Sequence, residues 1–310
     1  MNQLNNRLAF MKIARRCALW IAIVIAIFIA LVTIDSLVGL VYRTDTTAKV
    51  SIISPRSGTT RRAIVVFPGY MMSGAILGRA FAKHVADEDA LVVVDYAERG
   101  VNVQQIYVKV MASLRTLKPV EIRVYGASMG GMIGKLFLDY YRQDGAPYGK
   151  VLLVLDSAPA GPNDIKRPTF LFNFGCWYRG GPLSTAVWAA VSKCMSGPPI
   201  EDNASPDLVR AARHAGAWAG MPSATSQACF IAEFNPMIEN ELVDIAKQVI
   251  YLHGDSPADD PLVRVSESVE GWRKVYPNLI AITIQSRAGR WHLPLVERPS
   301  ETVKALIATY

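Results

Sequence analysis

The sequence predicts an α/β domain with a mostly parallel sheet flanked by helices, an inserted cap, and one transmembrane helix in front of it. Three features lead to this prediction. A long apolar run lies near the N-terminus, short β-branched runs then alternate with helical patterns, and about 85 residues without clear strands interrupt this alternation once. We expect the anchor in residues 1–44 and the globular domain in residues 45–310, with the cap at about 157–245.

The composition suits a folded protein and argues against nucleic-acid binding. The chain has 310 residues, of which 51% are hydrophobic and 19% charged, so a sizeable core can form. Its formal charge of +7 divides into +4 over residues 1–43 (five cations, one anion) and +3 over the remainder (28 cations, 25 anions). This mild surplus contains no dense cluster of Lys and Arg, so nucleic acid is not an expected partner.

The apolar run at residues 17–34 is the candidate membrane anchor. Thr33 is its only residue that is not apolar. As a helix these residues reach about 27 Å, close to the roughly 30 Å hydrocarbon core of a bilayer, and residues 37–42 could extend it. A cleaved signal peptide is the alternative, because two arginines precede the run. The run is long for a signal, however, and no good Ala-x-Ala site follows it, so we expect an uncleaved signal anchor.

Charge around this run predicts a single-pass orientation. Four cations and no acidic residue precede it, so the positive-inside rule keeps the N-terminus in the cytoplasm. The catalytic domain would then be extracytoplasmic, in a periplasm or lumen. Four cations that follow the run weaken this prediction: Arg43, Lys49, Arg61 and Arg62.

Three cysteines lie outside the apolar run: Cys176, Cys194 and Cys229. An oxidising compartment would permit one disulfide among them, and Cys176 with Cys194 is the nearest pair in sequence. Three isolated thiols in packed positions are the alternative.

The globular part reads as alternating strands and helices. Lys49–Ile53 and Arg62–Phe67 flank a Ser-Gly turn and predict an antiparallel hairpin at a sheet edge. Further strands are predicted at residues 90–94, 121–125, 150–155, 248–252 and 279–284, and helices at 75–86, 104–117, 131–142, 262–275 and 300–308. Strands this apolar imply burial on both faces, as in a parallel sheet. The interruption is too long for a simple loop and should cover the carboxyl ends of the strands, where such sheets place their sites.

Gly126-Ala127-Ser128-Met129-Gly130 is the candidate nucleophile motif. It lies directly between a predicted strand and a predicted helix. A strand that turns sharply into a helix holds the middle serine in a strained conformation, and its neighbours two positions away must be small. The serine hydroxyl then projects near the positive end of the helix dipole.

In this context the sequence resembles the α/β-hydrolase superfamily over residues of about 60–156 and 245–310, while the cap is unmatched. The resemblance implies a serine esterase with a catalytic triad. A serine hydroxyl needs a base, and His292, after the last strand and before Pro294, resembles the family's catalytic histidine loop. The family usually has glycine before this histidine, where this chain has Trp291.

The acid of the triad should lie between serine and histidine in chain order. The loop after the penultimate strand contains three aspartates. Its Asp-Pro-Leu-Val tetrapeptide resembles the family pattern, so Asp260 is preferred over Asp259 and Asp255. Asp156, at the end of the strand before the cap, occupies the position that some lipases use. Each of these carboxylates could instead cap a loop or helix.

Two backbone N–H groups should form the oxyanion hole. Met129, which follows the nucleophile, provides one. The other should come from Tyr70, or alternatively Met71, in the loop after Pro68-Gly69, where the family often has His-Gly. Only the N–H matters, so the proline leaves the donor in place.

These residues predict a membrane-anchored serine hydrolase that acts on a small-molecule or lipid-like ester through an acyl-enzyme. We expect no cofactor and no metal, because the sequence contains no metal-ligand cluster, phosphate loop or dinucleotide fingerprint. An acyltransferase, a peptidase or a thioesterase could use the same triad. A catalytically inactive hydrolase fold that acts as a binding module is the remaining alternative.

Overall fold

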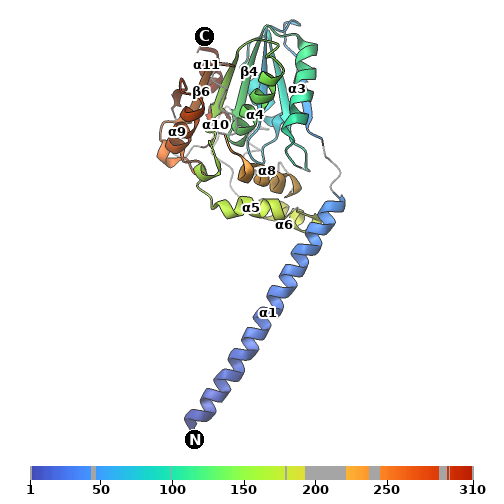
Figure 1. Cartoon of the computed structure of the whole chain (residues 1–310), viewed down its shortest axis with the longest axis vertical. Coiled ribbons are helices and arrows are strands. Elements are labelled where there is room, and N and C mark those ends of the chain that lie inside the picture. Colours follow the sequence, from blue (N-terminus) through green and yellow to red (C-terminus); the bar gives the residue numbers. More distant parts are fainter. Residues whose placement is uncertain are drawn as a thin grey trace.

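A seven-stranded sheet forms the centre of the globular domain (Figure 1). In this computed structural model, the described residues are 2–42, 47–98, 100–178, 180–192, 221–236, 245–285, 292 and 294–308. The strands are β1 (Lys49–Ile53), β2 (Arg62–Phe67), β3 (Asp89–Asp95), β4 (Glu121–Ala127), β5 (Val151–Asp156), β6 (Ala246–Gly254) and β7 (Ile280–Ile284). Their order in the sheet is β1-β3-β2-β4-β5-β6-β7, and every pair is parallel except β1 with β3. The prediction of a mostly parallel sheet is therefore confirmed.

The predicted hairpin of β1 and β2 is wrong. β1 pairs antiparallel with β3, from Lys49 opposite Asp95 to Ile53 opposite Leu91, and β3 therefore lies between β1 and β2. The Ser-Gly turn is compatible with a hairpin, but local turn chemistry does not choose the neighbour of a strand. The strongly apolar β3 is buried by inserting between two strands that are consecutive in sequence.

Helices cover both faces of the sheet. On one face lie α3 (Val103–Leu117), α4 (Met129–Gln143) and α9 (Val265–Val275), and on the other α2 (Gly74–Ala82), α10 (Pro294–Glu297) and α11 (Pro299–Ala308). The inward positions of α3 recur at helical spacing, with Ile106, Val110 and Leu114 almost fully buried. Asn102 begins this helix by accepting a hydrogen bond from the Gln105 N–H at 2.9 Å.

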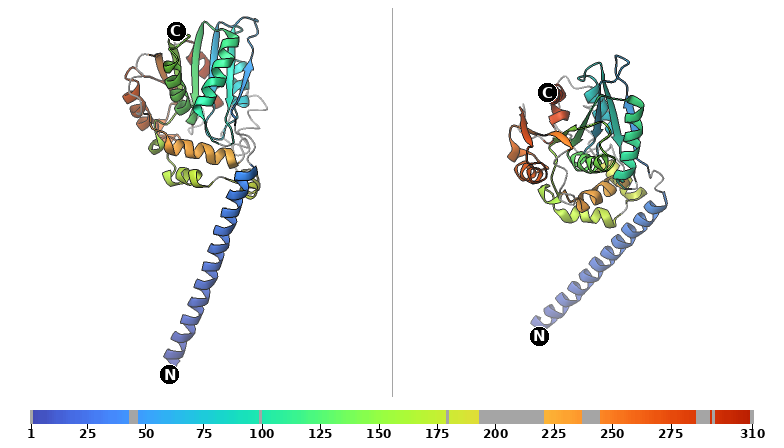
Figure 2. Two further views of the ribbon diagram at one scale, coloured as in Figure 1. Left: turned by 45° about the vertical axis from the view of Figure 1, so that its right-hand side comes forward. Right: turned by 45° about the horizontal axis from the view of Figure 1, so that its top comes forward.

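The interruption of the sheet pattern forms a helical cap at the carboxyl ends of the strands. Its described helices are α5 (Thr169–Trp177), α6 (Pro182–Ser192) and α8 (Met221–Glu233). In the views of Figures 1 and 2, α8 lies next to the sheet and α5 lies outside α8. This is the position in which open α/β sheets place their sites.

A disulfide joins α5 to α8 and corrects the predicted cysteine pairing. Cys176 is bonded to Cys229, with Cα atoms 4.4 Å apart, whereas its predicted partner Cys194 lies outside the described residues. Nearness in sequence does not bring two cysteines together. Here the two helices touch closely, since a Cβ at Gly175 would lie 2.7 Å from the Cβ of Ala228.

The N-terminal helix α1 (Asn2–Tyr42) extends away from the domain (Figure 1). Its segment Met11–Val41 is long and apolar enough to cross a membrane, and its most apolar window is exposed throughout. Within the described part of the chain, α1 contacts the rest of the molecule at its last turns, against α6.

Candidate active site

The nucleophile candidate Ser128 lies in a sharp turn between β4 and α4. Its backbone has φ 50° and ψ −118°, a strained region for a residue with a side chain. Both glycines of the motif are required by close backbone contacts. A Cβ at Gly126 would lie 2.5 Å from the carbonyl oxygen of Gly130, and one at Gly130 would lie 2.1 Å from the carbonyl oxygen of Phe67. Glycine is therefore needed two positions before and two positions after Ser128 because a side chain would collide with the backbone there, as the sequence suggested.

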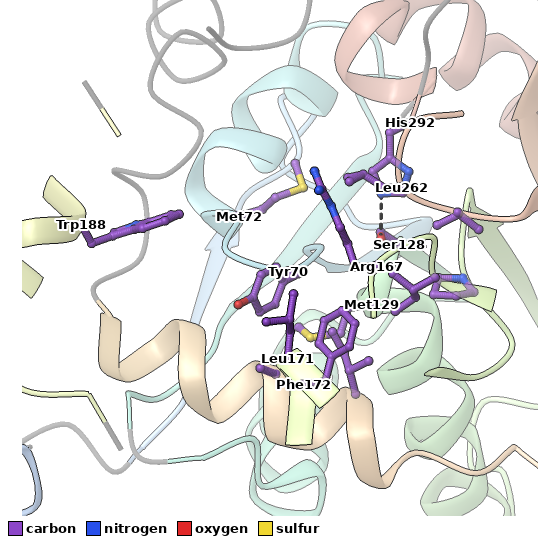
Figure 3. A pocket seen from close by; sticks show the side chains of 15 residues that line it. Tyr70, Met72, Ser128, Met129, Arg167, Leu171, Phe172, Trp188, Leu262 and His292 are labelled. Atoms are coloured by element: carbon purple, nitrogen blue, oxygen red, sulfur yellow. Dashed lines mark hydrogen bonds between the residues drawn. The ribbon is translucent and has the colours of Figure 1, made fainter. Parts of the chain in front are cut away.

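The structure brings His292 to Ser128. The imidazole Nε2 lies 2.9 Å from the serine Oγ, as the dashed line in Figure 3 marks. Of the other three histidines, His84 is exposed beside α2, His253 contacts the Gly254 carbonyl at the end of β6, and His214 lies outside the described residues. Trp291 also lies outside them.

On the other side of His292 lies the carboxylate of Asp260. Its Oδ2 and Oδ1 are 3.2 and 3.3 Å from the imidazole Nδ1. The backbone N–H groups of Leu262 and Val263 each donate to Oδ1 at 2.8 Å. Asp260 is 3% exposed. With these donors the carboxylate can accept Nδ1–H, which leaves Nε2 free to take a proton from serine.

The alternative acids are placed differently. Asp255 is exposed, and Asp259 belongs to the short 3-10 helix η3 (Pro257–Asp259), its side chain lying outside the described part of the chain. Asp156 is fully buried at the end of β5, where it accepts hydrogen bonds from the Tyr125 hydroxyl and, at 3.1 Å, from the Leu295 N–H. Burial raises the pKa of Asp156 to about 7. Its carboxylate therefore holds the segment that follows His292 and does not hydrogen-bond the imidazole.

The loop that carries the predicted oxyanion donors, Tyr70 and Met71, follows β2, and we call it the oxyanion loop. It contains a turn in which the Met72 N–H donates a hydrogen bond to the Gly69 carbonyl at 3.1 Å. Met71 has a φ of 59°, and its N–H donates to Oε1 of Gln227 on the cap helix α8 at 2.6 Å. This bond occupies the alternative donor and leaves Tyr70. Met129 starts α4, where no earlier turn of the helix supplies an acceptor for its N–H.

Solved structures with the same architecture include an esterase from Thermogutta terrifontis, with a TM-score of 0.60 and 16% identity over 84% of this chain and 92% of that one. An esterase from Rhodococcus sp. ECU1013 has a TM-score of 0.58 and 19% identity over 86% and 97%. A type II thioesterase from the borrelidin biosynthetic cluster has a TM-score of 0.52 and 14% identity over 84% and 94%. The chain has the α/β-hydrolase fold. At the level of sequence, no family model and no curated protein matches it.

A cavity of about 540 Å³ lies under the cap and reaches Ser128 and His292 (Figure 3). Most of the lining is apolar and includes Met72, Ile165, Leu171, Phe172, Trp188, Ile231, Leu262 and Val263. Arg167 is a charged residue in this mostly apolar lining, and its guanidinium forms no ion pair with a carboxylate of the described residues. The space suits an apolar group, with one cationic side chain on its lining.

Contacts between cap and active-site loops were not foreseen from the sequence. The Lys166 ammonium donates to the carbonyls of Ala258 and Asp260 at 2.8 and 2.6 Å, and Ile165 forms a bridge with Val263. With the Gln227 bond, the cap thus contacts both the acid loop and the oxyanion loop. No motif signals these roles, because the cap resembles no pattern in the family.

One group of potential metal ligands occurs in the described part of the chain, namely Cys176, Cys229 and Glu233. The two sulfurs are bonded to each other, so neither is a thiolate. This group therefore does not form a metal site while the disulfide is intact.

Proposed function

We propose that the chain is a membrane-anchored serine hydrolase that cleaves a carboxylic ester through an acyl-enzyme. The observation that carries this proposal is the hydrogen-bonded series from Ser128 through His292 to Asp260, built on a strained strand-to-helix turn. Esterases among the solved structures with this fold add support for ester hydrolysis in general. The fold alone does not determine the reaction, so the proposal depends mainly on the geometry of Ser128, His292 and Asp260.

In the first step, the Ser128 Oγ attacks the ester carbonyl carbon and its proton passes to Nε2 of His292. Asp260 stabilises the imidazolium that forms. The tetrahedral intermediate then expels the alcohol, which takes the proton from Nε2. Water repeats the sequence on the acyl-enzyme, and the acid is released with Ser128 restored.

The N–H groups of Tyr70 and Met129 are the proposed donors to the oxyanion. Such donors stabilise charge that develops only in the transition state, and each is typically worth about 10²–10³ in turnover. The bond from the Met71 N–H to Gln227 holds the loop that carries Tyr70.

We place α1 across a membrane and the catalytic domain outside the cytoplasm. The length and apolar character of Met11–Val41 support the span. The cations before it support a cytoplasmic N-terminus. The Cys176–Cys229 disulfide supports an oxidising compartment for the domain.

Labelling with a fluorophosphonate probe tests the nucleophile. The wild-type protein should be labelled and should hydrolyse short p-nitrophenyl esters. Ser128→Ala should retain its circular dichroism spectrum and lose both properties. Ser51→Ala, an exposed serine on β1, is the matched control and should behave as wild type. Undiminished labelling of Ser128→Ala would place the nucleophile elsewhere.

A further inference from the structure

The cap helices α5 and α6 expose large apolar side chains. On α5 these include Phe170 and Trp177, which are 66% and 62% exposed, and on α6 they recur every fourth residue. The full set is Phe170, Leu171, Phe174, Trp177, Leu183, Val187 and Val191. We call this set the apolar cap face. On α5, Phe170, Phe174 and Trp177 lie opposite Phe172 and Gly175, which are buried toward α8, so these three side chains point away from the domain, while Leu171 lies at the margin of the face.

Neither helix carries a charged residue. The sequences TFLFNFGCW and PLSTAVWAAVS contain no Asp, Glu, Lys or Arg. By contrast the surface helix α9 has four charged side chains in VSESVEGWRKV, all on its exposed side or its margin. A helix whose exposed stripe is apolar and uncharged is unusual against water and typical of a surface that something apolar covers.

The membrane-anchor candidate α1 is attached to this part of the cap. Asp35, the acidic residue of α1, is buried against the start of α6 and its carboxylate receives three hydrogen bonds. The donors are the Leu183 N–H at 2.8 Å, the Ser184 N–H at 3.2 Å and the Tyr178 hydroxyl at 2.5 Å. The carboxylate therefore caps α6 from another helix, using the free N–H groups at its first turn.

Close backbone contacts tighten the same joint. A Cβ at Gly39 of α1 would lie 1.7 Å from the Gly180 carbonyl oxygen, and one at Gly181 would lie 2.0 Å from the Asp35 carbonyl oxygen. Glycine at both positions allows the two backbones to touch. The end of α1 and the start of α6 are therefore held in one arrangement.

With α1 across a membrane as proposed above, this joint would set the cap at the level of the membrane surface. The apolar run of α1 covers residues 17–34 and ends one residue before Asp35. If that run fills the hydrocarbon core, Asp35 and the helix it caps lie at the boundary with the headgroups. Trp177 and Tyr178 are next to the joint, and aromatic residues of this kind favour that boundary.

We propose that the apolar cap face lies in the interface of the bilayer that α1 spans, and that the substrate is an acyl-ester lipid taken from that leaflet. The inference rests on the membrane anchor and ester hydrolysis proposed above. Leu171 and Phe172 of α5 and Trp188 of α6 also line the cavity that reaches Ser128. The helices that would contact lipid are thus the ones that border the path to the nucleophile (Figure 3).

Nitroxide labelling tests the docking without reference to activity. Full-length protein in which Cys17 and Cys194 are replaced by alanine would carry Val187→Cys, in phosphatidylcholine vesicles. The label at position 187 should be relaxed by oxygen, which enters lipid, and protected from a water-soluble nickel chelate. Val108→Cys on α3, an equally exposed valine outside the cap, should show the reverse. Equal access of the nickel chelate to both labels would overturn the docking.

Paired activity measurements test the lipid substrate. The double variant Phe170→Asp, Val187→Asp places two charges on the apolar cap face, and neither residue lines the cavity. Its rate on a long-chain ester embedded in vesicles should fall roughly tenfold, equivalent to about 1.4 kcal/mol of lost interfacial binding, while its rate on soluble p-nitrophenyl acetate stays at the wild-type level. Val108→Asp should change neither rate.

The two assays separate the two proposals. An unchanged ratio of vesicle rate to soluble rate in the double variant would overturn the lipid substrate. A wild-type protein that hydrolyses neither ester would instead contradict the proposed function, and the nitroxide measurement would still decide the docking.

Discussion

Two buried carboxylates lie within reach of the His292 segment, and their surroundings assign them different tasks. Asp260 contacts the imidazole and receives two backbone N–H donors. Asp156 receives a tyrosine hydroxyl and one N–H, and burial raises its pKa to about 7. Because Asp260 lies against the imidazole Nδ1, it is the carboxylate placed to stabilise an imidazolium.

Replacement of Asp260 by asparagine should lower turnover by roughly 10⁴, because the amide favours the wrong imidazole tautomer. Asp156→Asn should stay within about tenfold of wild type, since the Tyr125 hydroxyl and the Leu295 N–H both donate to Oδ2, whose place the amide oxygen can take. The measurement is kcat on a short p-nitrophenyl ester, with circular dichroism to verify folding. A reversed order of the two losses would move the acid to the strand before the cap, and small losses at both would favour a dyad.

The raised pKa of Asp156 also predicts how stability depends on pH. The native state holds the carboxyl proton more tightly than the unfolded chain, whose pKa is near 3.8. The stabilisation is therefore complete below that value and is lost as pH rises toward about 7, a change of up to about 4 kcal/mol.

Thermal unfolding in detergent at pH 4, 5.5 and 7 measures this effect as a difference between two proteins. Asp156→Asn cannot ionise, so its Tm should fall less than that of the wild type as pH rises over this range. Parallel Tm curves for the two proteins would mean that Asp156 titrates normally.

At the scale of elements, the cap helix α8 holds the candidate oxyanion loop through a hydrogen bond from Gln227. Gln227 is almost fully buried, and its Oε1 accepts from the Met71 N–H at 2.6 Å. Its amide nitrogen donates to the Ser223 hydroxyl at 2.9 Å. This contact fixes the position of the loop that carries Tyr70, whose N–H is our proposed oxyanion donor.

Gln227→Leu should therefore lower kcat by about 10- to 100-fold with a smaller change in KM, because small displacements of a positioned group cost this much. Ser223→Ala is the control, since it removes the other bond of Gln227 and keeps the acceptor for Met71. Steady-state kinetics on a short soluble ester measures kcat and KM for both variants. Equal losses of kcat in both variants would indicate a general loosening of α8 and contradict a specific role for the Met71 contact.

At the scale of the whole molecule, one long helix and one disulfide constrain where the domain works. The expected topology places a C-terminal reporter outside the cytoplasm. In a bacterial host, an alkaline phosphatase fusion at Tyr310 should be active and a green fluorescent protein fusion should be dark. The protein should also stay with membranes after a carbonate wash, as a chain of full length.

The opposite reporter pattern would place the domain in the cytoplasm, where the Cys176–Cys229 bond would not persist. A shorter, soluble product would favour a cleaved signal peptide. Phosphatase activity and fluorescence of the two fusions report the orientation, and an immunoblot of the membrane and soluble fractions reports the chain length.

The order of strands and helices follows from the sequence because it depends on local pattern. Runs such as Val151–Asp156 are too apolar for any place except the interior, and the spacing of Ile106, Val110 and Leu114 matches one face of a helix. The turn at Ser128 is also local, since its glycines lie within two positions of the serine. These features predicted the α/β-hydrolase fold and the nucleophile candidate.

The sequence by itself determined the fold class, the sharp turn at Ser128 and the long apolar helix near the N-terminus, because short-range sterics and local runs of apolar residues govern all three. Only the tertiary structure decided that β3 inserts beside β1, that Cys176 meets Cys229, and which aspartate lies against His292. Those outcomes depend on which distant surfaces pack together. Such packing is a property of the whole chain and cannot be recognised from the local sequence around these residues.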